Sequence, residues 1–96
     1  MPSRSSTSTR RIYTLYVIEL SDGSLYVGSS ALEPEERFRQ HVDGVLTAYP
    51  VKRYGAKRLR SDLAARRYAF TRPKAEEIEQ ELAATLRRRG YCVWQG

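Results

Sequence analysis

The sequence is nearly devoid of cysteine and histidine, with one residue of each type, Cys92 and His41. A disulfide framework and every Cys/His zinc pattern within one chain are therefore excluded. A nucleophilic catalyst of the Cys-His-Asn or Ser-His-Asp kind would have to use that single histidine. Cys92 is expected to be a core residue with no assigned chemistry.

Long apolar stretches are also missing. No run approaches the roughly 20 residues that cross a bilayer, and residues 1–11 lack the apolar region of a signal peptide. These absences predict a cytoplasmic protein without a membrane partner. Residues 1–11 are rich in serine, threonine and arginine without periodicity, which is typical of a disordered tail. Residues 12–96 are long enough for one domain with one core.

Positive charge is in excess, and it is concentrated in the middle of the chain. Lys and Arg number 17 against 11 Asp and Glu, for a net charge of +6. Residues 44–75 hold nine basic side chains against Asp62 alone, interleaved with aromatic rings at Tyr49, Tyr54, Tyr68 and Phe70. Such a segment is typical of a nucleic-acid surface, although a solvated charge run is the plain alternative. The candidate DNA-binding residues are Arg39, Lys52, Arg53, Lys57, Arg58 and Arg60.

The pattern of apolar and turn residues predicts an α/β (α+β) domain. Strands are expected at 12–20 and 25–28, joined by a turn at 21–24, with a third at 67–70 and a short one at 91–94. Helices are expected from Pro34 to about Asp43, with Phe38 and Val42 as apolar positions, and from about 72 to 89. A further short helix within 57–64 fits the intervening segment. Mostly antiparallel pairing follows from this order.

Polar residues recur in positions where packing alone does not require them. Tyr16 and Tyr26 lie on the two strands of the predicted hairpin, close enough to share a target. Arg37 and His41 are four residues apart on one helix face. Glu79 falls within the apolar stripe of the last helix, where a carboxylate needs an arginine or a metal ion as partner. Together these groups are the set that metal-assisted phosphodiester hydrolysis needs, although each has a structural explanation when taken alone.

Four motifs in order resemble the GIY-YIG endonuclease domain over residues 13–95. The segment 15–17 (Leu-Tyr-Val) is similar to the first motif of the family, and 26–28 (Tyr-Val-Gly) is similar to the second. The segment 37–41 is similar to the Arg-x-x-x-His helix, and 75–82 is similar to the Ala-x-x-x-Glu-x-x-Leu helix. Leu15 replaces the first glycine of the family name. A late asparagine has no clear equivalent, and Gln95 lies nearest to its place.

The resemblance implies a three-stranded antiparallel sheet flanked by helices and hydrolysis that leaves 5′-phosphate and 3′-hydroxyl ends. It implies that Tyr16 is the general base, assisted by His41, and that Tyr26 and Arg37 contact the scissile phosphate. It also implies that Glu79 binds one Mg²⁺ or Mn²⁺ ion, and that Gly28 permits close approach to the site. We therefore expect a metal-dependent endonuclease acting on DNA, structure-selective or weakly sequence-specific. The alternative is a non-catalytic nucleic-acid-binding module that retains the fold.

Overall fold

The domain is built on a tight hairpin near its N-terminal end. The computed structural model describes residues 12–44, 48–64 and 67–95, so the predicted tail lies outside the described residues. Strands β1 (Tyr13–Leu20) and β2 (Leu25–Ser30) pair antiparallel. Between them the Asp22 carboxylate accepts hydrogen bonds from the backbone N and the Oγ of Ser24 at 3.0 and 2.6 Å. Gly23 has φ +90°, so the predicted turn chemistry is confirmed.

The sheet around this hairpin has five strands and is mixed, which corrects the predicted three-stranded antiparallel sheet. Strands β3 (Ala56–Leu59) and β4 (Tyr68–Ala69) pair antiparallel with β1 at opposite ends. Strand β5 (Val93–Gln95) pairs parallel with β2. The helix predicted within 57–64 is confined to α4 (Ser61–Ala64). Residues 57–59 instead belong to an edge strand, because their backbone pairs with β1. This pairing joins segments that are far apart in the sequence, so the local sequence does not predict it.

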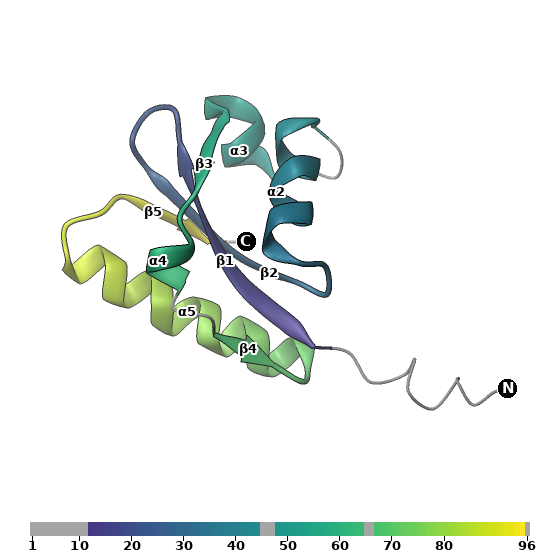
Figure 1. The fold of residues 1–96 in the computed structure, drawn as a ribbon. Helices are drawn as coiled ribbons and strands as arrows, with labels where there is room; N and C mark the ends of the chain where they lie inside the picture. The colour runs from purple at the N-terminus through teal and green to yellow at the C-terminus, as the bar shows by residue number, and fades with distance from the viewer. Residues whose placement is uncertain (1–11, 45–47, 65–66, 96) are drawn as a thin grey trace, which may run out of the picture.

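Helices cover both faces of the sheet, as Figure 1 shows. Helix α5 (Arg72–Arg88) begins after Thr71, whose side chain accepts a hydrogen bond from the backbone N of Lys74 at 3.2 Å. Helix α2 (Pro34–Val42) lies over the opposite face together with α3 (Tyr49–Tyr54). Helix α3 was not predicted, because Pro50 indicated an interruption. Proline is tolerated in the first turn of a helix, and Pro50 lies in that turn.

The core has two parts, one on each face of the sheet. Leu15, Val17, Leu82 and Leu86 belong to the part beneath α5. The other part, beneath α2 and α3, consists of the buried residues Tyr16, Ile18, Leu20, Tyr26 and Val51. Successive residues of β1 therefore face opposite helices, as strand alternation requires. This alternation sends the side chain of Tyr16 toward α2.

Two sequence-based core assignments are wrong. Cys92, which precedes β5, is exposed. Its backbone joins the sheet, because the Cys92 carbonyl accepts a hydrogen bond from Leu25 N at 2.8 Å, but its side chain does not enter the core. Val42 is 55% exposed at the last turn of α2, while Phe38 is half-buried against the α2-side core. None of the described helices combines the length and apolar character that crossing a membrane requires.

Candidate active site

A cleft opens at the end of β2, where both faces of the sheet contribute side chains. Its volume is about 520 Å³. We call it the Glu79 cleft, and its lining residues are Tyr13, Tyr16, Tyr26, Gly28, Ser29, Ser30, Ala31, Leu32, Arg37, Gln40, Arg72, Glu76 and Glu79. Four of the five predicted catalytic residues line it, and the fifth, His41, contacts Tyr16 directly. The structure thus brings together residues that are far apart in the sequence.

Three rings meet at the buried end of this cleft. The centroids of Tyr16 and Tyr26 are 6.2 Å apart, and each lies 5.7 Å from the centroid of His41. The tyrosines share a face because Tyr16 is opposite Gly28 in the hairpin register and Tyr26 is opposite Ile18. His41 is buried, at 3% exposure, rather than at the rim of its helix. The two phenols and the imidazole are therefore packed together at this end of the cleft.

The Tyr16 hydroxyl lies 3.1 Å from Nε2 of His41. Burial raises the pKa of Tyr16 well above its ordinary value, and the neighbouring Tyr26 adds to this. Burial lowers the pKa of His41 to about 4, with the nearby Arg37 guanidinium contributing to the shift. At neutral pH the tyrosine is therefore protonated and the imidazole neutral, and the imidazole tautomer decides which of the two donates the hydrogen bond.

Arg37 brings positive charge to the same cleft. It is one helical turn before His41 on α2, and its Nη1 donates a hydrogen bond to Gln40 Oε1 at 2.8 Å. Its charge opposes the burial effect at Tyr16 and lowers the pKa of that phenol. A guanidinium oriented in this way suits an anionic substrate group such as a phosphodiester.

Glu79 reaches the cleft from α5, on the other side of the sheet. It is 4% exposed, and its Oε2 accepts a hydrogen bond from Ser29 Oγ. Its Oε1 is buried and has no hydrogen-bond partner among the described residues. Burial raises the pKa of this carboxyl, against the lowering effect of Ser29. A buried oxygen without a partner is costly, so the chemistry of this carboxylate suits a ligand such as a cation.

The donor set around Glu79 fits one hard cation with many waters. No group of three or more His, Cys, Asp or Glu side chains able to hold a metal occurs within the described ranges. Mg²⁺ typically binds one or two carboxylates and keeps several waters, with substrate phosphates completing its shell. The unpartnered Oε1 of Glu79 fits that preference, and Glu76 lines the same cleft.

Several cleft residues were not found by sequence analysis. Arg72 is the most informative, since its guanidinium lies 5.2 Å from the centroid of the Tyr13 ring and it lines the cleft. The sequence feature that could have identified Arg72 is its spacing from Glu76 and Glu79. The three residues are four and three positions apart and therefore share one face of α5. Ser29 follows Gly28 directly and donates a hydrogen bond to Glu79, a residue 50 positions away in the sequence. The sequence alone does not predict this contact.

The six predicted DNA-binding cations lie elsewhere. Within the described residues none of them lines the Glu79 cleft, and the cations that do are Arg37 and Arg72. Arg39, Lys52 and Arg53 are exposed on α2 and α3. The side chains of Lys57, Arg58 and Arg60 surround Glu19, at N–O distances of 3.7, 2.8 and 3.1 Å. Gln95 is exposed at the end of β5, away from the cleft lining.

Comparison with known proteins agrees with this geometry. The sequence model of the protein family described as the GIY-YIG catalytic domain matches residues 12–91 of this chain. No curated protein and no solved structure shows a significant match to the chain. The matched range spans most of the sequence and contains every residue of the candidate site. The chain therefore belongs to the GIY-YIG nuclease family.

Proposed function

We propose that this protein is a Mg²⁺- or Mn²⁺-dependent endonuclease that hydrolyses DNA phosphodiester bonds, with structure selectivity or weak sequence specificity. The observation that carries the proposal is the meeting of a tyrosine–histidine pair, an arginine and a buried carboxylate at one cleft. Proton acceptance, phosphate binding and metal binding are the three tasks of this chemistry, and each has its own residue here.

Tyr16 and His41 act as a proton relay. The phenol does not ionise on its own near neutral pH, since burial raises its pKa. It can accept a proton from the attacking water if its own proton passes to His41 Nε2, 3.1 Å away. The imidazole, whose pKa burial lowers to about 4, is neutral near pH 7, and in the tautomer that carries its hydrogen on Nδ1 the Nε2 atom can accept that proton.

The other residues hold the phosphate and the leaving group in position. Arg37 offsets the charge that develops on the phosphoryl oxygens, and Tyr26 offers a hydroxyl donor from the same wall. The new bond joins the water oxygen to phosphorus, the P–O3′ bond breaks with its electron pair, and O3′ takes a proton from a solvent water, which leaves 5′-phosphate and 3′-hydroxyl ends. Glu79 would hold the metal ion through Oε1. The ion, when bound, stabilises negative charge on the phosphate and the departing oxygen.

The test is cleavage of duplex, single-stranded, flapped and branched DNA with Mg²⁺ or Mn²⁺ by wild-type protein and two matched variants. Glu79→Gln preserves side-chain volume but removes the charge, and we expect a drop of about a hundredfold or more in cleavage rate. Glu81→Gln changes an exposed glutamate of the same helix outside the cleft and should leave the rate unchanged. Full activity of Glu79→Gln would refute the metal assignment.

A second variant addresses the relay. Tyr16→Phe removes only the hydroxyl, and we expect the cleavage rate to fall by about 10²- to 10⁴-fold, the usual contribution of a positioned acid or base.

The alternative function has its own outcome in the same experiment. If no DNA of the panel is cut by wild-type protein at any metal concentration, while binding is retained, the chain is instead a non-catalytic nucleic-acid-binding module.

A further inference from the structure

A second cavity adjoins the Glu79 cleft. It measures about 550 Å³ and lies on the edge of β1, between the points where β3 and β4 pair with that strand. The chain leaves this edge at Arg60, whose N donates to Val17 O at 2.7 Å, and returns at Arg67, whose carbonyl accepts from Leu15 N at 3.0 Å. We call it the Tyr68 pocket. Apart from Tyr16, its lining residues have no part in the reaction proposed above.

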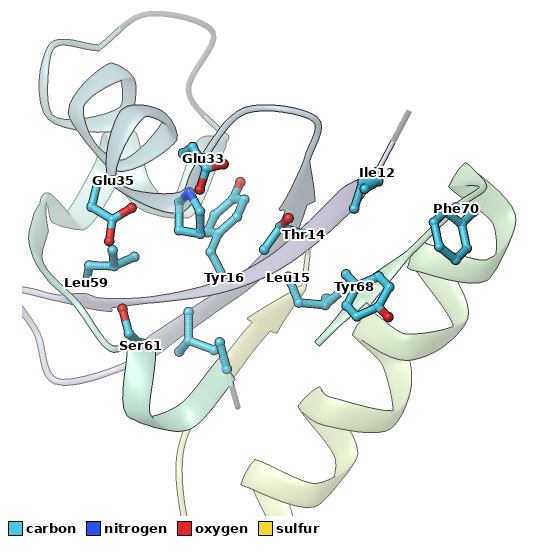
Figure 2. Close-up of a pocket in the computed structure, with 13 residues that line it drawn as sticks. Ile12, Thr14, Leu15, Tyr16, Glu33, Glu35, Leu59, Ser61, Tyr68 and Phe70 are labelled. Atoms are coloured by element: carbon cyan, nitrogen blue, oxygen red, sulfur yellow. The ribbon is translucent and has the colours of Figure 1, made fainter. Parts of the chain in front are cut away.

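Figure 2 shows how the side chains surround this pocket. Tyr68 and Phe70 lie at one end, beside Leu15, and Leu59 and Ser61 close the other. The Tyr68 and Phe70 rings are each 55% exposed and contact one another edge to face, with centroids 5.6 Å apart. Two large rings that are more than half exposed contribute little to the core, and exposed rings are typical of sites that stack nucleic-acid bases.

The charged side chains of the pocket determine which part of a nucleotide can bind there. Glu33 and Glu35 stand on its rim, and its lining, which is drawn from the described residues, contains no Lys or Arg. A phosphate would be repelled there, whereas an uncharged aromatic base would not. Carboxylates also accept hydrogen bonds from the amino groups of bases. The carboxylates of Glu33 and Glu35 thus make the described part of the pocket better suited to a nucleobase than to a phosphate.

Tyr16 joins the two cavities. Its side chain lines both the Glu79 cleft and the Tyr68 pocket. A base and its phosphate are separated by a single sugar, so adjoining cavities with a common wall can take both parts of one nucleotide. Arg72 of the cleft begins the helix that follows the strand carrying Tyr68. The anionic and the aromatic parts of the substrate would thus meet chemically different surfaces.

We propose that the Tyr68 pocket binds an unpaired nucleobase next to the scissile phosphate, so that DNA with an unpaired nucleotide at the cut is the preferred substrate class. This rests on the proposed function, since it assigns the phosphate to the Glu79 cleft. A base within a duplex must first be unpaired and unstacked at a cost of a few kcal/mol. A flap, bulge or frayed end has no such cost.

The test measures binding in metal-free buffer, where cleavage does not interfere. Fluorescence anisotropy compares a flapped DNA with a fully paired duplex of equal length, for wild-type protein, Tyr68→Ala, Phe70→Ala and the control Val42→Ala. Val42 is also an exposed apolar side chain, at 55%, but it lies on α2 outside both the pocket and the cleft. Because the three side chains are exposed, the variants should fold, which thermal melting by circular dichroism verifies.

We expect Tyr68→Ala and Phe70→Ala each to weaken flap binding by about fivefold or more, the loss of one stacked base, with duplex binding unchanged. Val42→Ala should alter the affinity for neither DNA by more than about twofold. A 2-aminopurine at the unpaired position should lose fluorescence on binding wild-type protein, and it should lose less on binding Phe70→Ala. Equal weakening on both DNAs, or none, overturns the proposal.

Two further outcomes separate this inference from neighbouring ones. If Glu79→Gln no longer cuts but keeps the flap preference, the pocket assignment holds and is independent of catalysis. If wild-type protein cuts all DNAs equally and the ring variants match it, the nuclease assignment stands and the pocket proposal falls. A change of sedimentation from oligomer to monomer in Tyr68→Ala would show that the pocket takes a second copy of the chain, which also overturns it.

Discussion

Gly28 is the residue on which the position of the Tyr16 ring depends most directly. It lies opposite Tyr16 in the hairpin, and a Cβ added to it would lie 2.6 Å from the Tyr16 hydroxyl oxygen and 2.7 Å from Cζ. These distances are shorter than van der Waals contact, and Tyr16 is only 2% exposed, so its ring has little room to move. The requirement for glycine here comes from side-chain space, because no positive φ is involved.

Gly28→Ala should therefore displace the Tyr16 hydroxyl. We expect destabilisation by about 1–3 kcal/mol from overpacking and a cleavage loss of about a hundredfold, as for other small misplacements of reacting groups. Urea unfolding and single-turnover cleavage measure the two effects. In a Tyr16→Ala background the same alanine should cost less stability because the ring is gone. Additive free energies in that double-mutant cycle would contradict the clash.

His41 makes stability depend on pH, and it is the only histidine of the chain. Its folded pKa of about 4 is below the ordinary 6.5. Between these values the unfolded chain binds a proton that the folded chain does not, so stability is complete above about pH 6.5 and falls as pH is lowered toward 4. The slope is at most about 1.4 kcal/mol per pH unit.

The matched variant for this prediction is His41→Gln, which removes the titrating ring. Glu79 contributes with the opposite sign, because burial raises its pKa and its contribution to stability is lost as pH rises. Glu79 is present in both proteins, so the difference between them isolates the histidine. We expect the stability difference measured by urea unfolding to narrow from pH 7 to pH 4. Parallel curves would show that His41 is not desolvated in the folded protein.

At the scale of elements, the sequence reveals those whose signals are local. The β1–β2 hairpin follows from a strand-forming run and the Asp22–Gly23 turn, and the glutamate on the apolar stripe of α5 marks Glu79 as unusual. Strand β3 carries no such signal, since Lys57 and Arg58 are exposed and the strand exists through pairing with β1. The same holds for the contact of Ser29 with Glu79, which joins residues of different elements.

Helix α5 gives a prediction of its own, because it carries both Arg72 and Glu79. Thr71 Oγ1 accepts a hydrogen bond from Lys74 N and so satisfies one of the free amides at the helix start. Thr71→Ala should lower the free energy of unfolding by about 1 kcal/mol. Thr71→Ser retains an acceptor and serves as the control. Equal stability of the alanine and serine variants in urea unfolding would show that the cap contributes nothing.

For the whole molecule, the positions of the charged side chains are more informative than the net charge of +6. The basic middle of the chain is predicted to bind DNA, yet three of its cations are gathered around Glu19, whose side chain is 13% exposed. Hydrogen bonds from Arg58, with help from Arg60, lower the pKa of Glu19 and keep it ionised. Arg60 also pairs with Asp62 at 3.1 Å. The positive surface is therefore partly neutralised by the fold itself.

Glu19→Gln removes this neutralisation without adding a cation. If Lys57 and Arg58 face DNA phosphates, the variant should bind duplex DNA more tightly than wild type. The plot of log affinity against log salt should become steeper by about 0.9, the value for one additional phosphate contact. Glu81→Gln makes the same charge change on α5, away from this cluster, and separates the local effect from net charge. Equal salt slopes for the two variants would place the DNA on another face, where Arg39, Lys52 and Arg53 are exposed.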